Sequence, residues 1–73
     1  MTNDPNVARM RRYSRLLEMF LPSEVDDGFA SVLWQAACDE SLYETFLREE
    51  YLHRFSADLK LNMRLLARKF SAN

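Results

Sequence analysis

The segment SLYETFLREEYLHRFSADLKLNMRLLARKF, residues 41–70, decides the fold because no glycine or proline interrupts it. Its residue types favour one long helix from about residue 42 to 70. Two sets of apolar residues would, however, lie on opposite sides of that helix: Leu42, Tyr43, Phe46 and Leu47 in its first part, and Leu59, Met63, Leu66 and Phe70 in its second. We therefore predict a break within residues 51–57, with Ser56 as the cap of a new helix.

Capping patterns place two further helix starts. SLYE at residues 41–44 is a capping box and predicts the start of the helix that follows it. SEVD at residues 23–26 resembles a capping box that ends in Asp, and it predicts a short helical turn that Gly28 ends. Between these two, apolar residues recur at helical spacing and predict a helix over residues 29–38.

The first helix is predicted from Asp4 as N-cap and Pro5 as first helical residue to about Leu21, where Pro22 stops it. One side of this helix is mostly apolar, and we expect it to face the core: Val7, Met10, Ser14, Leu17, Phe20 and Leu21. Arginines project from the other side.

These elements predict an all-α fold, with residues 1–73 forming a single domain of about four helices, some of them short. We expect residues 1–3 to be disordered and residues 71–73 to be frayed. Large apolar residues from every helix supply the expected core: Met10, Leu17, Phe20, Phe29, Leu33, Phe46, Leu59, Met63, Leu66 and Phe70.

The composition argues against several classes of protein. The single cysteine, Cys38, is expected to be a packed free thiol, which indicates a reducing compartment such as the cytoplasm. The sequence has no signal region, no run long enough to span a membrane and no conventional zinc-ligand spacing. His53 follows Glu49 and Glu50 at helical spacing, but a surface histidine is the more common case. No phosphate loop or nucleophile motif is present, so we expect no enzyme activity and no cofactor.

Charge is segregated along the chain, although the net charge is only −1. Residues 1–17 carry +3, residues 18–50 carry −8 and residues 51–73 carry +4. Part of the acidic middle is explained by helix starts and by the pairs Glu44–Arg48 and Glu50–Arg54 at i, i+4. A basic partner surface would favour the same distribution.

Two basic clusters have alternative interpretations. Arg9, Arg11, Arg12 and Arg15 crowd the first helix, and Lys60, Arg64 and Arg68 form a ridge at i, i+4, i+8 on the last. Both could follow phosphates, or both could be solvent-facing sides of amphipathic helices. The acidic pI of about 5.7 is unlike that of a dedicated nucleic-acid binder.

Leu61 and Leu65 lie off the main apolar stripe of the last helix. Either the first helix covers them, or they form an exposed apolar strip of the kind used in protein docking.

Three functions compete at this point. The first is a protein-binding regulator that uses the segregated charges and the leucine strip. The second is a helix-turn-helix DNA-binding protein built from residues 29–55, although its recognition helix would be acidic. The third is an antitoxin-like homo-oligomer.

In its length, its few helices and its basic ends around an acidic centre, the chain resembles small host-takeover factors of lytic bacteriophages. It is most similar to the type of regulator that binds the largest subunit of bacterial RNA polymerase, displaces σ factor and promotes antitermination. The resemblance implies a non-enzymatic protein in the host cytoplasm that contacts an acidic or RNA-facing part of polymerase, but it transfers no residue by position. We expect the free protein to be a monomer. The expected partner-binding residues are Arg9, Arg11, Arg12, Arg15, Lys60, Leu61, Arg64, Leu65 and Arg68.

Overall fold

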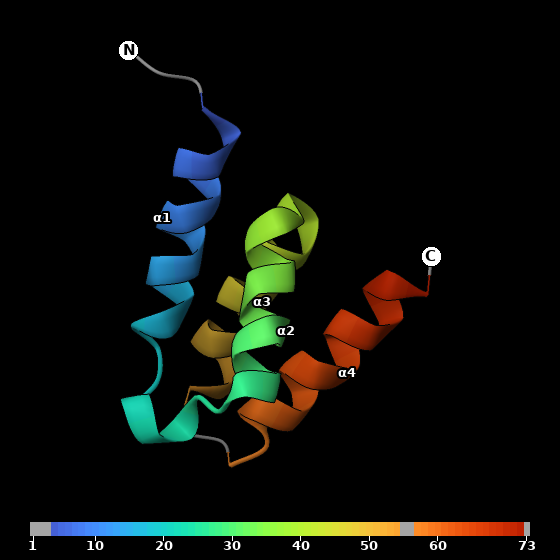
Figure 1. Ribbon diagram of the computed structural model, residues 1–73. Coiled ribbons are helices and arrows are strands. Elements are labelled where there is room, and N and C mark those ends of the chain that lie inside the picture. Colours follow the sequence, from blue (N-terminus) through green and yellow to red (C-terminus); the bar gives the residue numbers. More distant parts are fainter. Residues whose placement is uncertain (1–3, 55–56, 73) are drawn as a thin grey trace.

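The structure is a computed structural model that describes residues 4–54 and 57–72, and within them it shows four α-helices, one 3₁₀ helix and no strand (Figure 1). The helices are α1 (Pro5–Leu17), the 3₁₀ helix Pro22–Glu24, α2 (Asp27–Cys38), α3 (Glu40–His53) and α4 (Leu59–Ser71). The predicted all-α class is confirmed. Residues 1–3, which we expected to be disordered, lie outside the described residues, and so does residue 73. The fraying expected from residue 71 onward is not found at Ser71, which is the last residue of α4, and Ala72 is its C-cap.

Helix α2 is central. It packs against α1 on one flank and against α3 and α4 on the others, and α3 also packs against α4 (Figure 1). The side chains of all four helices that this packing buries form the core: Leu16, Phe29, Leu33, Ala36, Ala37, Leu42, Phe46, Leu59, Met63 and Ala67. Leu17, Phe20, Leu66 and Phe70 pack against the core but remain partly exposed.

Helix α1 starts as predicted and ends earlier. The Asp4 carboxylate accepts a hydrogen bond from the Asn6 N–H at 2.9 Å, and Pro5 is the first helical residue. The helix ends at Leu17 rather than near Leu21. Residues before a proline avoid helical backbone angles, and Leu21 is extended here. The early end lets Phe20 meet the Phe29 ring edge to face, with centroids 5.0 Å apart.

The predicted core-facing side of α1 is wrong in part, because Leu17 and Phe20 pack against the core and Val7, Met10 and Leu21 do not. Leu16 is fully buried, whereas Met10 is 53% exposed and Val7 is 39% exposed. Leu17 and Tyr13 lie beside Leu16 and pack against the core. Periodicity located an apolar stripe, but Val7 and Met10 lie about 180° and 120° around the helix from buried Leu16, so they face away from the core.

The connection to α2 also differs from the prediction. Residues 22–24 form the 3₁₀ helix, and the Leu21 N–H donates to the Glu24 carboxylate at 2.7 Å. Gly28 does not end this turn but lies in the first turn of α2. Asp26 is the N-cap of α2, because its carboxylate accepts from the Phe29 N–H at 2.7 Å.

Helices α2 and α3 are separated only by Asp39, which is also the N-cap of α3. Its carboxylate accepts from the Ser41 and Leu42 N–H groups at 3.1 and 3.3 Å. The predicted capping box at residues 41–44 is therefore wrong, and Ser41 lies inside the helix.

The predicted break is confirmed, because α3 ends at His53 and α4 begins at Leu59. Ser56, the predicted cap, lies outside the described residues, and Asp58 occupies the N-cap position of α4 without a side-chain capping bond. Cys38 was predicted to be packed but is exposed at the end of α2. None of the described helices is long and apolar enough to cross a membrane.

Candidate functional site

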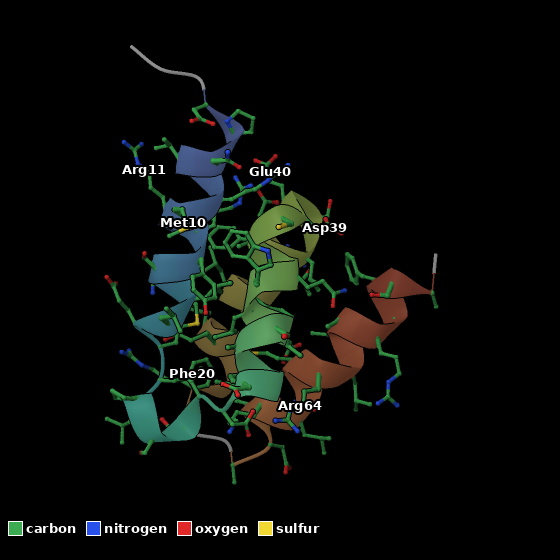
Figure 2. The ribbon with its side chains drawn as sticks, viewed as in Figure 1. Met10, Arg11, Phe20, Asp39, Glu40 and Arg64 are labelled. Carbon is green, nitrogen blue, oxygen red and sulfur yellow. The ribbon has the colours of Figure 1, made fainter. Side chains whose placement is uncertain are left out.

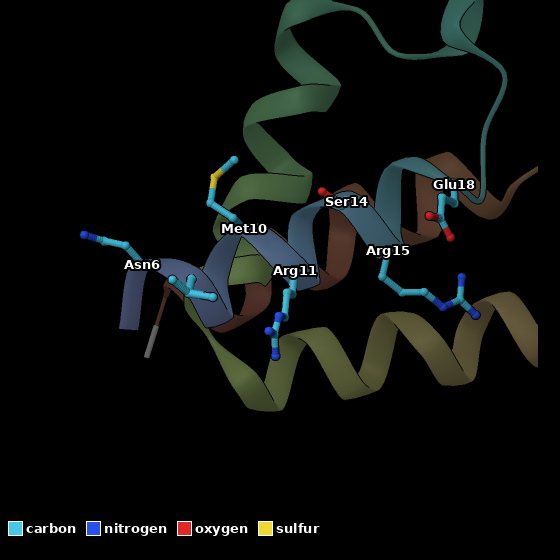
Figure 3. A pocket seen from close by; sticks show the side chains of 7 residues that line it. Asn6, Met10, Arg11, Ser14, Arg15 and Glu18 are labelled. Carbon is cyan, nitrogen blue, oxygen red and sulfur yellow. The ribbon is translucent and has the colours of Figure 1, made fainter. Parts of the chain in front are cut away.

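The outward side of α1 carries an open hollow of about 500 Å³ (Figure 3). We call this the α1 surface, and two rows of side chains spaced by one helical turn line it: Asn6, Met10, Ser14 and Glu18 in one row, and Val7, Arg11 and Arg15 in the other. Arg11 and Arg15 extend in the same direction from the helix, and Met10 points away from them (Figure 3). The surface therefore combines exposed apolar groups with two cations.

The four N-terminal arginines do not act as one cluster. Arg11 and Arg15 are exposed, and neither makes a hydrogen bond or ion pair with any part of the chain that the structure describes. Arg9 is half-buried and donates to the Asn6 side-chain oxygen at 3.4 Å. Arg12 turns inward, and its Nε donates to the Ala37 carbonyl at 2.7 Å.

The Arg12 contact has a structural purpose. The last carbonyls of a helix lack partners within the helix and carry the negative end of its dipole. Arg12 supplies a charged donor to one of these carbonyls near the end of α2 and thereby ties α1 to α2. Of the predicted N-terminal set, only Arg11 and Arg15 remain fully available to a partner.

The basic ridge on α4 is also divided. Lys60 donates from Nζ to the Glu24 carbonyl, and the same Nζ lies 4.9 Å from the centroid of the Phe29 ring. Arg64 lies 3.6 Å from the Asp26 carboxylate and 5.6 Å from the Phe29 centroid. These two cations hold α4 against the start of α2, whereas Arg68 is exposed and makes no such contact with the described residues.

Asp26 joins two of these interactions. The hydrogen bond from the Phe29 N–H lowers the pKa of Asp26 below its ordinary value, and the positive charges of Arg64 and Lys60 lower it further. Desolvation of the carboxyl acts in the opposite direction and is a larger effect than that of either cation. The charged form is therefore the one that caps α2 and pairs with α4.

Leu61 and Leu65 are exposed, by 54% and 50% of their surfaces. Helix α1 lies on the other flank of α2 and does not cover them (Figure 1). Of the two alternatives open from the sequence, the structure shows the exposed strip.

A second recess of about 360 Å³ lies beside Leu65, between the end of α3 and α4. Its lining comes from both helices: Glu49, His53, Asn62, Leu65, Leu66 and Lys69. His53 Nε2 is 3.7 Å from a Glu49 carboxylate oxygen, which is longer than a hydrogen bond. That oxygen is buried and accepts no hydrogen bond from the described residues.

Lys69 and Glu49 are absent from the set predicted from the sequence. Lys69 follows Leu65 by one helical turn, so the spacing of the leucine strip could have found it. Glu49 enters the recess only because α4 folds back beside α3, and no local pattern encodes that contact.

Several acidic side chains cap helices or form ion pairs within a helix. Asp26 and Asp39 cap α2 and α3, and Glu50 pairs with Arg54 at 3.6 Å as predicted. No ion pair joins Glu44 and Arg48, and the exposed start of α3 carries Glu40 (Figure 2). A DNA-reading helix is expected to be basic or amide-rich there, so the α2–α3 pair is poorly suited to the major groove.

The residues predicted to bind one partner thus lie on two flanks of the molecule. Figure 2 shows Met10 and Arg11 projecting from α1 on one side and Arg64 placed on α4 on the other. No group of three His, Cys, Asp or Glu side chains that could hold a metal ion occurs within residues 4–54 and 57–72. Comparisons with protein-family models, with curated proteins and with solved structures found no match to the chain.

Proposed function

We propose that the protein is a non-enzymatic regulator that binds another protein through the α1 surface. The observation that carries the proposal is the exposure of Val7 and Met10 beside two arginines that have no partner within the described residues. Exposed apolar side chains next to charged ones are typical of docking sites, and methionine adapts its shape to a partner.

The chemistry of this surface selects the kind of partner. Apolar groups on the partner would cover Val7 and Met10, and carboxylates would meet Arg11 and Arg15. Arginine pairs well with carboxylates because its planar group can donate two hydrogen bonds at once. Glu18 at the end of the hollow would oppose a partner carboxylate there and thereby help to fix the orientation.

A bacterial RNA polymerase is the partner that we propose to test first. The support for it is the resemblance of the chain, in length and in charge distribution, to phage regulators of that enzyme. In this proposal the bound protein inhibits initiation or promotes antitermination from a position on the polymerase surface. The α1 surface provides the contact.

The test is binding of the full chain to purified, nuclease-treated bacterial RNA polymerase, measured by biolayer interferometry. Met10→Asp should weaken binding at least about tenfold, because it places an uncompensated charge in the interface. Leu21→Asp is the matched control, since Leu21 is 66% exposed and lies outside the α1 surface. The control should bind as the unmodified protein does.

Charge reversal tests whether electrostatic attraction contributes to binding by the α1 surface. Arg11→Glu combined with Arg15→Glu should slow association and weaken binding while leaving the helix content unchanged. Arg48→Glu reverses the charge of an exposed residue on α3 and should have little effect on binding. Unchanged affinity in the double variant would remove the α1 surface from the interface, and failure of the unmodified protein to bind would reject polymerase as the partner.

A further inference from the structure

Helix α4 has a second apolar side that the fold leaves uncovered. Leu59, Met63 and Ala67 face the core, whereas Leu61 and Leu65 are half exposed and one turn apart. The i, i+4 spacing gives a short apolar strip along the helix, which is the usual form of a helix-docking surface.

The charged residues of helix α4 all have one sign. Helix α4 contains four basic residues and no acidic one. Lys60 donates to the Glu24 carbonyl, and Arg64 pairs with the Asp26 carboxylate. Arg68 and Lys69 are exposed and make no hydrogen bond or ion pair with the described part of the chain. Two cations therefore remain available at the C-terminal half of the strip.

The recess between α3 and α4 extends this surface. Leu65, Leu66 and Lys69 of α4 are among the residues that line it. At about 360 Å³ it can receive one large apolar side chain next to the leucine strip. We define Leu61, Leu65, Arg68, Lys69 and this recess as the α4 surface.

We propose that the α4 surface is a second docking site, separate from the α1 surface, and that it binds an acidic amphipathic helix of a partner protein. The apolar side of that helix covers Leu61 and Leu65 and places one side chain in the recess. Its carboxylates meet Arg68 and Lys69. Because α1 and α4 lie on different flanks of α2, both surfaces can be occupied together, and the protein can join two partners (Figure 1).

Charge complementarity selects this occupant over two others. A second copy of the chain would set basic α4 against basic α4 in a two-fold dimer, which like charges disfavour. Nucleic acid would leave the two exposed leucines without a function, because phosphates contact only the cations. An acidic helix uses the leucines, the recess and both cations.

The test uses a defined probe and the full-length chain. The probe is a synthetic peptide of about 18 residues, long enough to form a helix, with leucine at i, i+4 and i+7 and glutamate at the flanking positions. Binding is followed by ¹H–¹⁵N NMR titration. We expect shifts in the amides of α4 and of the end of α3, and none in α1. The same peptide with lysine in place of glutamate should not bind.

Variants locate the site. Leu65→Asp should weaken peptide binding at least about tenfold, and Lys69→Glu should weaken it several-fold. Leu21→Asp and Arg48→Glu are the matched controls, and they should bind the peptide normally. Shifts confined to α1, or binding that Leu65→Asp does not weaken, would overturn the proposal.

Two further outcomes are decisive. If a single-stranded RNA oligonucleotide shifts the α4 amides more strongly than the peptide does, the surface is a nucleic-acid contact and the proposal is wrong. The α1 variants Arg11→Glu and Arg15→Glu should leave peptide binding unchanged, and Leu65→Asp should leave polymerase binding unchanged. Failure of one surface is thereby distinguished from failure of the other.

Discussion

Arg11 and Arg12 are adjacent in the chain but have different surroundings. Arg12 donates to the Ala37 carbonyl at 2.7 Å, and Arg11 stands in solvent on the α1 surface. A hydrogen bond from a charged donor contributes more to stability than one between neutral groups. Arg12 therefore holds α1 against α2, and Arg11 is left for a partner.

The methionine variants of these two residues should behave differently. We expect Arg12→Met to lower the free energy of unfolding by about 1–2 kcal/mol, because it keeps an apolar stem and removes the donor. Arg11→Met should lower it by less than about 0.5 kcal/mol. Urea unfolding followed by circular dichroism measures both. Equal losses in the two variants would show that the bond to Ala37 does not stabilise the fold.

Asp26 should make stability depend on pH in the acidic range. Its pKa is lower in the folded chain than its ordinary value of 3.8, mainly through the Phe29 N–H and then through Arg64 and Lys60. Such a group contributes stability above its unfolded pKa, and the contribution is lost as the pH falls through the folded pKa. The charged carboxylate therefore stabilises the fold at neutral pH.

The variant Asp26→Asn keeps an N-cap oxygen and removes the charge. We expect it to melt below the unmodified protein near neutral pH, with the difference shrinking once the pH falls below 3.8. Thermal melts across that range measure the difference. Asp27→Asn is the control, since Asp27 makes no hydrogen bond or ion pair with the described residues. A difference that does not vary with pH would contradict the electrostatic explanation.

At the scale of the element, the start of α3 depends on one residue. Asp39 caps the helix through two N–H groups, whereas the Ser41 side chain, which the sequence predicted as the cap, lies inside it. Asp39→Ala should lower the free energy of unfolding by about 1 kcal/mol. Ser41→Ala should be neutral or slightly stabilising, because alanine is the better helix former. A larger loss of stability for Ser41→Ala than for Asp39→Ala would show that Ser41 caps the helix.

The helices themselves could be predicted from the sequence, but two of their starts could not. Apolar spacing identified α2 and the break before Leu59, and the residue types of a segment without glycine or proline predicted α3 and α4. Choosing Asp39 over Ser41 as the cap of α3, or identifying Asp26 as the cap of α2, requires the backbone angles that only the folded chain defines. Neighbouring polar residues are almost equally good caps, so sequence preference does not separate them.

The side of α1 that meets the core was mispredicted because the apolar stripe is offset around the helix from the side that is buried. Leu16 lies on the buried side, whereas Val7 and Met10 lie on the outward side with Arg11, so their apolar character does not bury them. The sequence therefore identified Arg11 and Arg15 as candidates but placed the apolar half of the same surface in the core. It anticipated Leu61 and Leu65 as an open alternative, because the spare strip was visible in the periodicity.

At the scale of the whole molecule, the fold separates the charges that alternate along the chain. Much of the acidic middle caps helices or pairs with nearby cations, while Arg11 and Arg15 on α1 and Arg68 and Lys69 on α4 remain unengaged with the described residues. Each flank carries exposed apolar side chains beside positive charge. Two copies that met through the same flank would bring like charges together.

We therefore expect a monomer. Sedimentation velocity should give the mass of one 8.7 kDa chain at low and at moderate ionic strength. High salt screens the cations, so a weak dimer through either flank would appear there first. A stable dimer at low salt that Met10→Asp or Leu65→Asp abolishes would contradict this expectation and favour a homo-oligomer.

The attachment of α1 mainly to one neighbour has a consequence for motion. Helices α2, α3 and α4 pack against one another, whereas α1 packs mainly against α2. Backbone amides in α1 should then exchange their hydrogens with solvent water sooner than those of α2. A protein seated on the outer side chains of α1 would slow this exchange by keeping the helix closed. Binding of that protein would therefore be detected at backbone amides that it does not contact.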